Sequence, residues 1–158
     1  MSRSKPNLYF ISVILTMLIL PVISILLDRA ALSTSICQLI GKWFVFWAIG
    51  IRLFLAGLRQ ASKPSFTAKE IFHIQGTESF AVIRELGFGN LAIGTGGIVS
   101  LLHPEWTSIM AIVGGLYFGL AGTLHLFKKV DSFNEIIALV SDLFIFIIMA
   151  AYVLYSFL

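Results

Sequence analysis

The stretch NEIIALVSDLFIFIIMAAYVLY, residues 134–155, decides the fold class of this chain. It is long enough for the roughly 20 residues that cross the hydrocarbon core of a bilayer, and it is almost entirely apolar. Comparable stretches occur at residues 8–27, 43–58, 79–102 and 107–127. Of the 158 residues, 58% are hydrophobic and 12% charged, whereas a soluble domain is about 25% charged. The sequence predicts an all-α polytopic bundle in a lipid bilayer, with residues 1–158 forming a single transmembrane domain.

The apolar stretches predict five transmembrane spans, and a four-span alternative would first discard residues 8–27 as a processed segment. The loop between the second and third spans has a capping-box pattern at Thr67 and Glu70, which predicts an interfacial helix at about 67–75. A second capping pattern precedes the fifth span, because Ser132 comes three residues before Glu135. Seven lysines and arginines lie on the side of the membrane that holds the N-terminus, and two lie on the opposite side. Positive residues concentrate on the cytoplasmic side, so we expect the N-terminus to be cytoplasmic.

Four ionisable residues interrupt these apolar stretches: Arg52, Arg84, Glu85 and Asp142. A charge at bilayer depth costs roughly 2.5–3.5 kcal/mol, so such residues usually face the bundle interior and mark a site or pathway. At about 1.5 Å per residue, all of them lie in the cytoplasmic half of their spans. We predict that Glu85 pairs with Arg52. Adjacent helical residues point about 100° apart, so Arg84 is predicted to pair with Asp142 instead.

Two further polar residues join these four as candidates for a ligand or proton site. Asn90 lies five residues beyond Glu85 in the same predicted span, and His125 lies near the cytoplasmic end of the fourth span. An imidazole titrates near neutral pH and can relay protons. The alternative for both is an ordinary structural hydrogen bond.

Small residues predict where helices pack closely, because glycine lets membrane helices approach one another. Residues 79–102 carry glycines on two faces, which predicts a central helix with neighbours on both sides. In the fourth span, small residues recur at intervals of four and fit packing within the chain or a homo-oligomer. The predicted packing residues are Gly87, Gly94, Gly97, Gly115 and Gly119.

Several classes of function lack their sequence signatures. Cys37 is the only cysteine, which excludes an internal disulfide and a cysteine-rich metal site. No Glu-x-x-His pair, nucleotide-binding glycine loop or nucleophile–base arrangement occurs, so we expect no metal and no cofactor, and an enzyme is less favoured than a non-enzyme. The small net charge of +3 comes from residues flanking the spans and does not indicate nucleic-acid binding.

Three segments carry a resemblance to a known family. They are KWFVFW from Lys42 on to Arg52 and Arg59, FTAKEIF at residues 66–72, and RELGFGN at residues 84–90. Over roughly residues 40–155 the chain resembles a family of small multi-pass prokaryotic membrane proteins classified as a domain of unknown function. The resemblance implies a place in the cell inner membrane and no particular activity.

Two functions remain open from the sequence. In the first, the Arg/Glu/Asp cluster in the cytoplasmic half binds or conducts a small solute or protons, as buried ionisable groups often do. In the second, the protein is a non-catalytic assembly or accessory subunit of a larger membrane complex, and the charges act as interhelical pins. A water-accessible cavity beside the cluster would favour the first function, and a dry, fully paired cluster the second.

Overall fold

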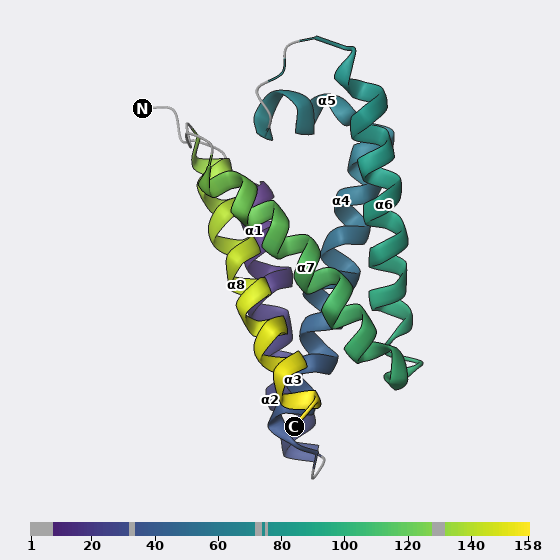
Figure 1. Cartoon of the computed structure of the whole chain (residues 1–158), viewed down its shortest axis with the longest axis vertical. Helices are drawn as coiled ribbons and strands as arrows, with labels where there is room; N and C mark the ends of the chain where they lie inside the picture. Colours follow the sequence, from purple (N-terminus) through teal and green to yellow (C-terminus); the bar gives the residue numbers. More distant parts are fainter. Residues whose placement is uncertain (1–7, 32–33, 72–73, 75, 128–131) are drawn as a thin grey trace.

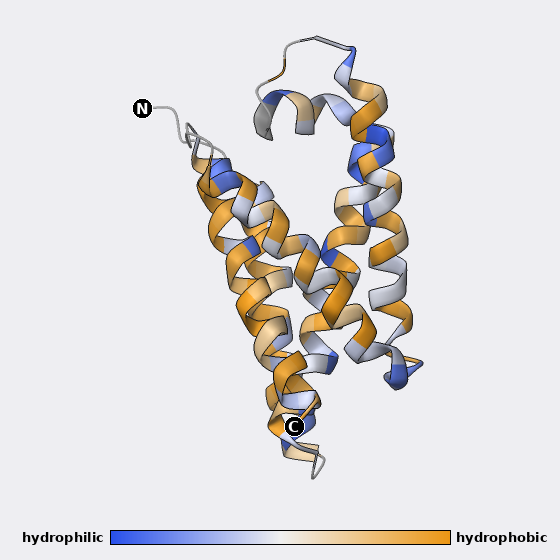
Figure 2. Cartoon of the chain, viewed as in Figure 1, coloured by the Kyte–Doolittle hydropathy of each residue, from blue (hydrophilic) through white to orange (hydrophobic). Residues whose placement is uncertain are grey.

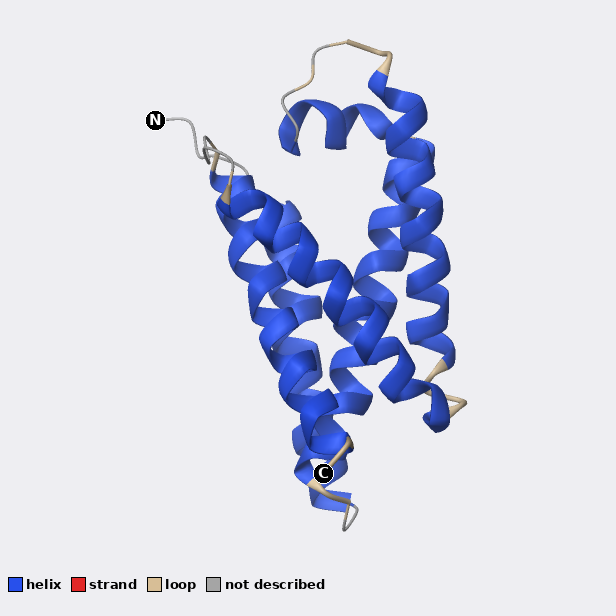
Figure 3. Cartoon of the chain, in the orientation of Figure 1, coloured by secondary structure: helices blue, strands red, loops and turns tan. Residues whose placement is uncertain are grey.

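The computed structural model describes residues 8–31, 34–71, 74, 76–127 and 132–158, and the described residues form helices joined by short loops, with no strand among them (Figure 3). The helices run back and forth along one long axis and open apart towards the end near the N-terminus (Figure 1). They are apolar over most of their length, with hydrophilic residues concentrated towards that end and in the loops (Figure 2). The all-α prediction is confirmed.

The first two long helices each contain a π-helical segment. The first comprises α1 (Leu8–Ile14), the π-helix η1 (Leu15–Ile19) and α2 (Leu20–Ala31), and the second comprises α3 (Ile36–Phe44), the π-helix η2 (Val45–Ile51) and α4 (Arg52–Ser62). In the first helix the π-helical turn comes just before Pro21, which has no backbone N–H to donate. The second begins seven residues earlier than the predicted start at Trp43.

The remaining elements complete the bundle. They are α5 (Pro64–Phe66), the π-helix η3 (Thr67–Ile71), α6 (Ser79–Val99), the 3₁₀-helix η4 (Pro104–Trp106), α7 (Thr107–Leu126) and α8 (Phe133–Ser156). The predicted capping box at Thr67 is wrong, because Thr67 has helical backbone angles and the short helix begins at Pro64. Part of the predicted interfacial helix lies outside the described residues. A different capping box, expected from Ser132 and Glu135, is confirmed at the start of α8.

Four helices are long and apolar enough to cross a membrane: Leu8–Ala31, Ile36–Ser62, Pro104–Leu126 and Phe133–Ser156. The shortest has 23 residues, or about 35 Å at 1.5 Å per residue, against a hydrocarbon core of about 30 Å. Helix α6, the predicted third span, is not among these four helices. The four-span alternative had instead discarded the first span, residues 8–27. Arg84, Glu85 and the glycines of α6 lower its hydropathy although it has 21 residues.

Helix α6 packs antiparallel against the second long helix through glycines on both. A Cβ at Gly94 would lie 2.5 Å from the Phe54 backbone nitrogen, and one at Gly57 would lie 2.6 Å from the Gly87 carbonyl oxygen. Gly97 lies in the same way against Gly50. The predicted neighbours on both sides of α6 are found at one end only: a Cβ at Gly96 would lie 2.7 Å from Met110 Sδ of α7, whereas Gly89 has nothing within 4 Å of its Cβ position. Over the rest of its length α6 lies at the edge of the bundle (Figure 1).

The core of the bundle lies where η2, α7 and α8 meet. Ile49, Ile145 and Met149 are fully buried there. The predicted packing residues of α7 lie against α8: a Cβ at Gly115 would be 2.9 Å from Met149 Cβ, and one at Gly119 would be 2.6 Å from the Phe146 ring. These contacts occur within the chain.

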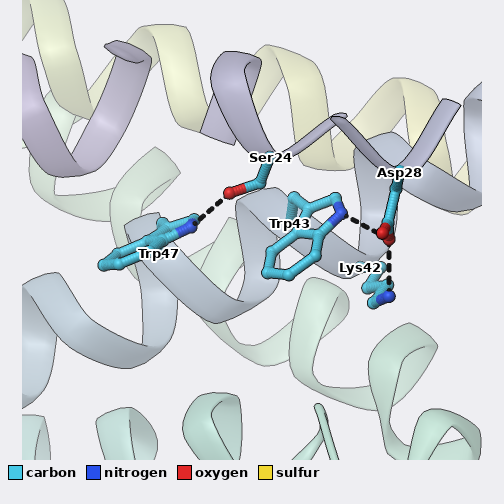
Figure 4. A network of polar contacts seen from close by, with 5 residues as sticks. All are labelled: Ser24, Asp28, Lys42, Trp43 and Trp47. Atoms are coloured by element: carbon cyan, nitrogen blue, oxygen red, sulfur yellow. Dashed lines mark hydrogen bonds and ion pairs between the residues drawn. The ribbon is translucent and has the colours of Figure 1, made fainter. Parts of the chain in front are cut away.

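A polar network joins the first two long helices at the end opposite the N-terminus (Figure 4). Asp28 accepts hydrogen bonds from Lys42 Nζ at 2.7 Å and from Trp43 Nε1 at 2.9 Å. One turn along each helix, Trp47 Nε1 donates to Ser24 Oγ at 3.0 Å. Two indole N–H groups and an ammonium group thus hold α2 against α3 and η2, and fix the first long helix within the bundle.

Candidate functional site: a polar cavity among the helices

A cavity of about 350 Å³ lies between α1, α4, α7 and α8, at the end of the bundle where α5 is found. This volume is at the small end of the range for ligand pockets, roughly 300–1,000 Å³. Much of its lining is polar although the surrounding helices are apolar. The polar residues that line it are Tyr9, Ser12, Arg52, Arg59, Gln60, Thr67, Asn90, Tyr117, His125 and Asp142.

Two arginines and two aromatic rings alternate along one side of this cavity. Arg52 and Arg59 are seven residues apart on α4, which places them two turns apart on one helix face. The Arg52 guanidinium carbon lies 5.3 Å from the centre of the Tyr9 ring, and that of Arg59 lies 3.5 Å from the centre of the Phe66 ring. Tyr9 and Phe66 are themselves 6.5 Å apart, so these contacts connect α1, α4 and α5.

Arg52 keeps a donor without a partner inside the protein. Its Nε is buried and makes no hydrogen bond. An unpaired buried donor costs roughly 1–3 kcal/mol, more when the group is charged.

An amide pair forms a second wall of the cavity. Asn90 on α6 is 2% exposed and donates from Nδ2 to Gln60 Oε1 at 2.7 Å, whereas its Oδ1 is buried without a partner. Tyr117 on α7 lines the same cavity as Asn90. Exchanging the O and N positions of Asn90 would still leave one of its atoms unpaired. Asn90 is thus, like Arg52, a residue of the cavity wall with one buried polar atom that makes no hydrogen bond.

Among the described residues that line the cavity, Asp142 is the only one with a carboxylate. Within the described part of the chain, no hydrogen bond or ion pair reaches its oxygens. Its charge interacts with that of Arg52 without direct contact between the two groups. Asp142 belongs to α8 and Arg52 to α4, and these two helices stand apart in the bundle (Figure 1).

The structure brings together four of the six predicted site residues: Arg52, Asn90, His125 and Asp142 line the cavity. Arg84 and Glu85 do not line it, and both are exposed on α6. Both predicted ion pairs are therefore wrong. For Glu85 the physical reason is rotation: the glycine face of α6 packs against α4, and Glu85 lies about 200° round the helix from Gly87, so it points away from the bundle.

Several cavity residues were missed by the sequence analysis. Arg59 and Gln60 follow Arg52 at intervals of seven and eight, a helical polar face that could have been recognised in the second span. Tyr9, Ser12 and Tyr117 carry no comparable signal, because a single tyrosine or serine in an apolar helix is common. Their place at the cavity depends on how the first and fourth helices are rotated.

Within the described residues, no three His, Cys, Asp or Glu side chains lie close enough together to hold a metal ion.

No curated protein and no solved structure matches the chain. A family model described as a family of unknown function, DUF6790, matches residues 7–157. This match covers nearly the whole sequence, so the chain belongs to the DUF6790 family.

Proposed function

We propose that this protein binds a small polar solute in the cavity and passes it, or protons, between the cavity and the adjoining membrane surface. One observation carries the proposal: in an otherwise apolar bundle, Arg52, Asn90 and Asp142 line the same cavity, and within the described residues no ion pair joins Arg52 to Asp142. Buried polar groups are normally satisfied, and exceptions concentrate at sites where a ligand or water completes the bonding.

The alternative role of an interhelical pin agrees less well with these contacts. A pin needs direct pairing, because charges removed from water are stabilised only by close partners. Arg52 and Asp142 do not form such a pair. A cavity between them supports solute binding instead.

The proposal includes an orientation in a prokaryotic inner membrane. With α6 as a fifth span and the N-terminus in the cytoplasm, the cavity would lie in the cytoplasmic half of the bilayer. The excess of lysine and arginine near that end supports this orientation. Arg59, exposed and stacked on Phe66, would then lie at the cytoplasmic mouth.

Hydration of the cavity can be tested with two adjacent residues of α7. Ala121 lines the cavity, whereas Leu120 is 72% exposed on the outer surface at nearly the same depth. In a Cys37→Ala background, Ala121→Cys should react with a hydrophilic thiol reagent in membranes, and Leu120→Cys, facing lipid, should not. If neither cysteine reacts, the cavity is dry and the accessory-subunit function is favoured.

A further inference from the structure

The charges around the cavity indicate which class of solute it takes, an inference that rests on the proposed function. Arg52 and Asp142 carry opposite charges on different helices, and neither neutralises the other by contact. A single molecule with a negative group near Arg52 and a positive group near Asp142 would supply the counter-charge that each side chain lacks. We propose that the cavity binds a small zwitterion, with a carboxylate and an ammonium group on one molecule.

The carboxylate of such a solute would be bound by α4. Arg52 lines the cavity, and a guanidinium group forms strong, charge-assisted hydrogen bonds to carboxylates. Arg59, two turns along the same face, adds a second positive charge towards the mouth. His125 also lines the cavity at this end.

The ammonium group would be bound between α8, α6 and the tyrosines. Asp142 supplies a carboxylate with no other hydrogen-bond partner in the described chain, and Asn90 Oδ1 supplies a buried acceptor. Tyr9 and Tyr117 both lie within electrostatic range of Asp142. Aromatic rings attract cations through their faces, and Tyr117 adds such a ring to the carboxylate, whereas the Tyr9 ring already lies against Arg52.

A solute with a single charge would fit less well. A monocarboxylate could be bound by Arg52 but would leave Asp142 as an unpaired negative charge beside it. A monoamine could be bound by Asp142 but would leave Arg52 unpaired. Each unpaired charge in a site removed from water carries a desolvation cost, so the zwitterion should be preferred over both.

The test is a panel of probes of matched size, measured by calorimetry and thermal shift on the full-length protein in detergent. Glycine, β-alanine and γ-aminobutyrate separate the two charges by increasing distances, and propionate and propylamine are β-alanine without one charge. The wild type should bind at least one of the zwitterions about 10- to 100-fold more tightly than propionate or propylamine, as expected for a charged hydrogen bond.

Two variants should exchange the preference. Asp142→Asn should lose zwitterion binding and gain propionate, because the carboxylate that repels an anion is gone. Arg52→Gln should lose zwitterion binding and gain propylamine. The matched controls are Glu85→Gln and Arg84→Gln, which remove exposed charges outside the cavity and should bind as the wild type does. A gained ligand also shows that the variant is folded.

The outcomes separate the solute class from the cavity itself. If propionate or propylamine binds the wild type as tightly as any zwitterion, the zwitterion inference is overturned while solute binding by the cavity stands. If none of the five probes binds, the zwitterion inference is also overturned. The proposed function is then decided independently by the reactivity of Ala121→Cys.

Discussion

The close packing of α4 and α6 positions Asn90 at the cavity, and substituting one glycine tests it. In Gly94→Ala, the new methyl group would lie 2.5 Å from the Phe54 backbone nitrogen and 2.8 Å from its Cα. These atoms belong to the facing helix backbone and cannot move aside singly. Gly89→Ala is the matched control, since nothing lies within 4 Å of its Cβ position.

The expected magnitude follows from two terms. Both substitutions gain roughly 1 kcal/mol of helix propensity, so this term cancels between them. Overpacking costs about 1–3 kcal/mol, and contact with backbone favours the upper value. Hence Gly94→Ala should lower the free energy of unfolding by about 2 kcal/mol, whereas Gly89→Ala should raise it by about 1 kcal/mol.

The assay is unfolding in detergent micelles with increasing SDS, followed by tryptophan fluorescence. The difference in unfolding free energy between the two variants reports the packing cost directly. Equal stability of Gly94→Ala and Gly89→Ala would refute the close α4–α6 contact. Solute binding should weaken only in Gly94→Ala, because a displaced α6 takes Asn90 away from the cavity.

Three further predictions concern other parts of the bundle. Trp43→Phe keeps an aromatic ring but removes the indole N–H that donates a hydrogen bond to Asp28. It should lower the unfolding free energy by about 1.5 kcal/mol in the same SDS titration. Ser132→Ala removes the cap of α8 and should cost about 0.5–2 kcal/mol; no measurable loss would mean that the cap does not form in detergent. In intact cells, Glu105→Cys should react with an impermeant thiol reagent and Lys63→Cys should not. The reverse labelling would invert the proposed topology.

Local chemistry made part of this structure predictable from sequence. The serine-to-glutamate spacing of the capping box identified the start of α8, since that pattern satisfies backbone donors wherever it occurs. The small residues Gly115 and Gly119 correctly indicated a close helix contact. The sequence could not say whether it was made to α8 or to a second copy, and α8 supplies Met149 and Phe146.

The partners of the charged residues were not predictable from depth alone. The rise per residue placed Glu85 and Arg52 at similar heights, but height says nothing of the direction in which a side chain points. The direction is set by Gly87 and Gly94, whose contact with α4 turns Glu85 outwards. Conversely, Asp142 reaches the cavity because α7 and α8 pack through Gly115.

The hydration of the cavity and the placement of Asp142 near Arg52 can be tested in one measurement. Asp142→Cys, in the Cys37→Ala background, places a thiol at the cavity wall. We compare its reaction rates with an anionic sulfonate reagent and a cationic trimethylammonium reagent of similar size. The thiol should react, faster with the anionic reagent, and Arg52→Gln should reduce this preference because Arg52 attracts the anion. A thiol that does not react, or reacts equally with both reagents whether or not Arg52 is present, would contradict a hydrated cavity in which Arg52 and Asp142 face a common solute.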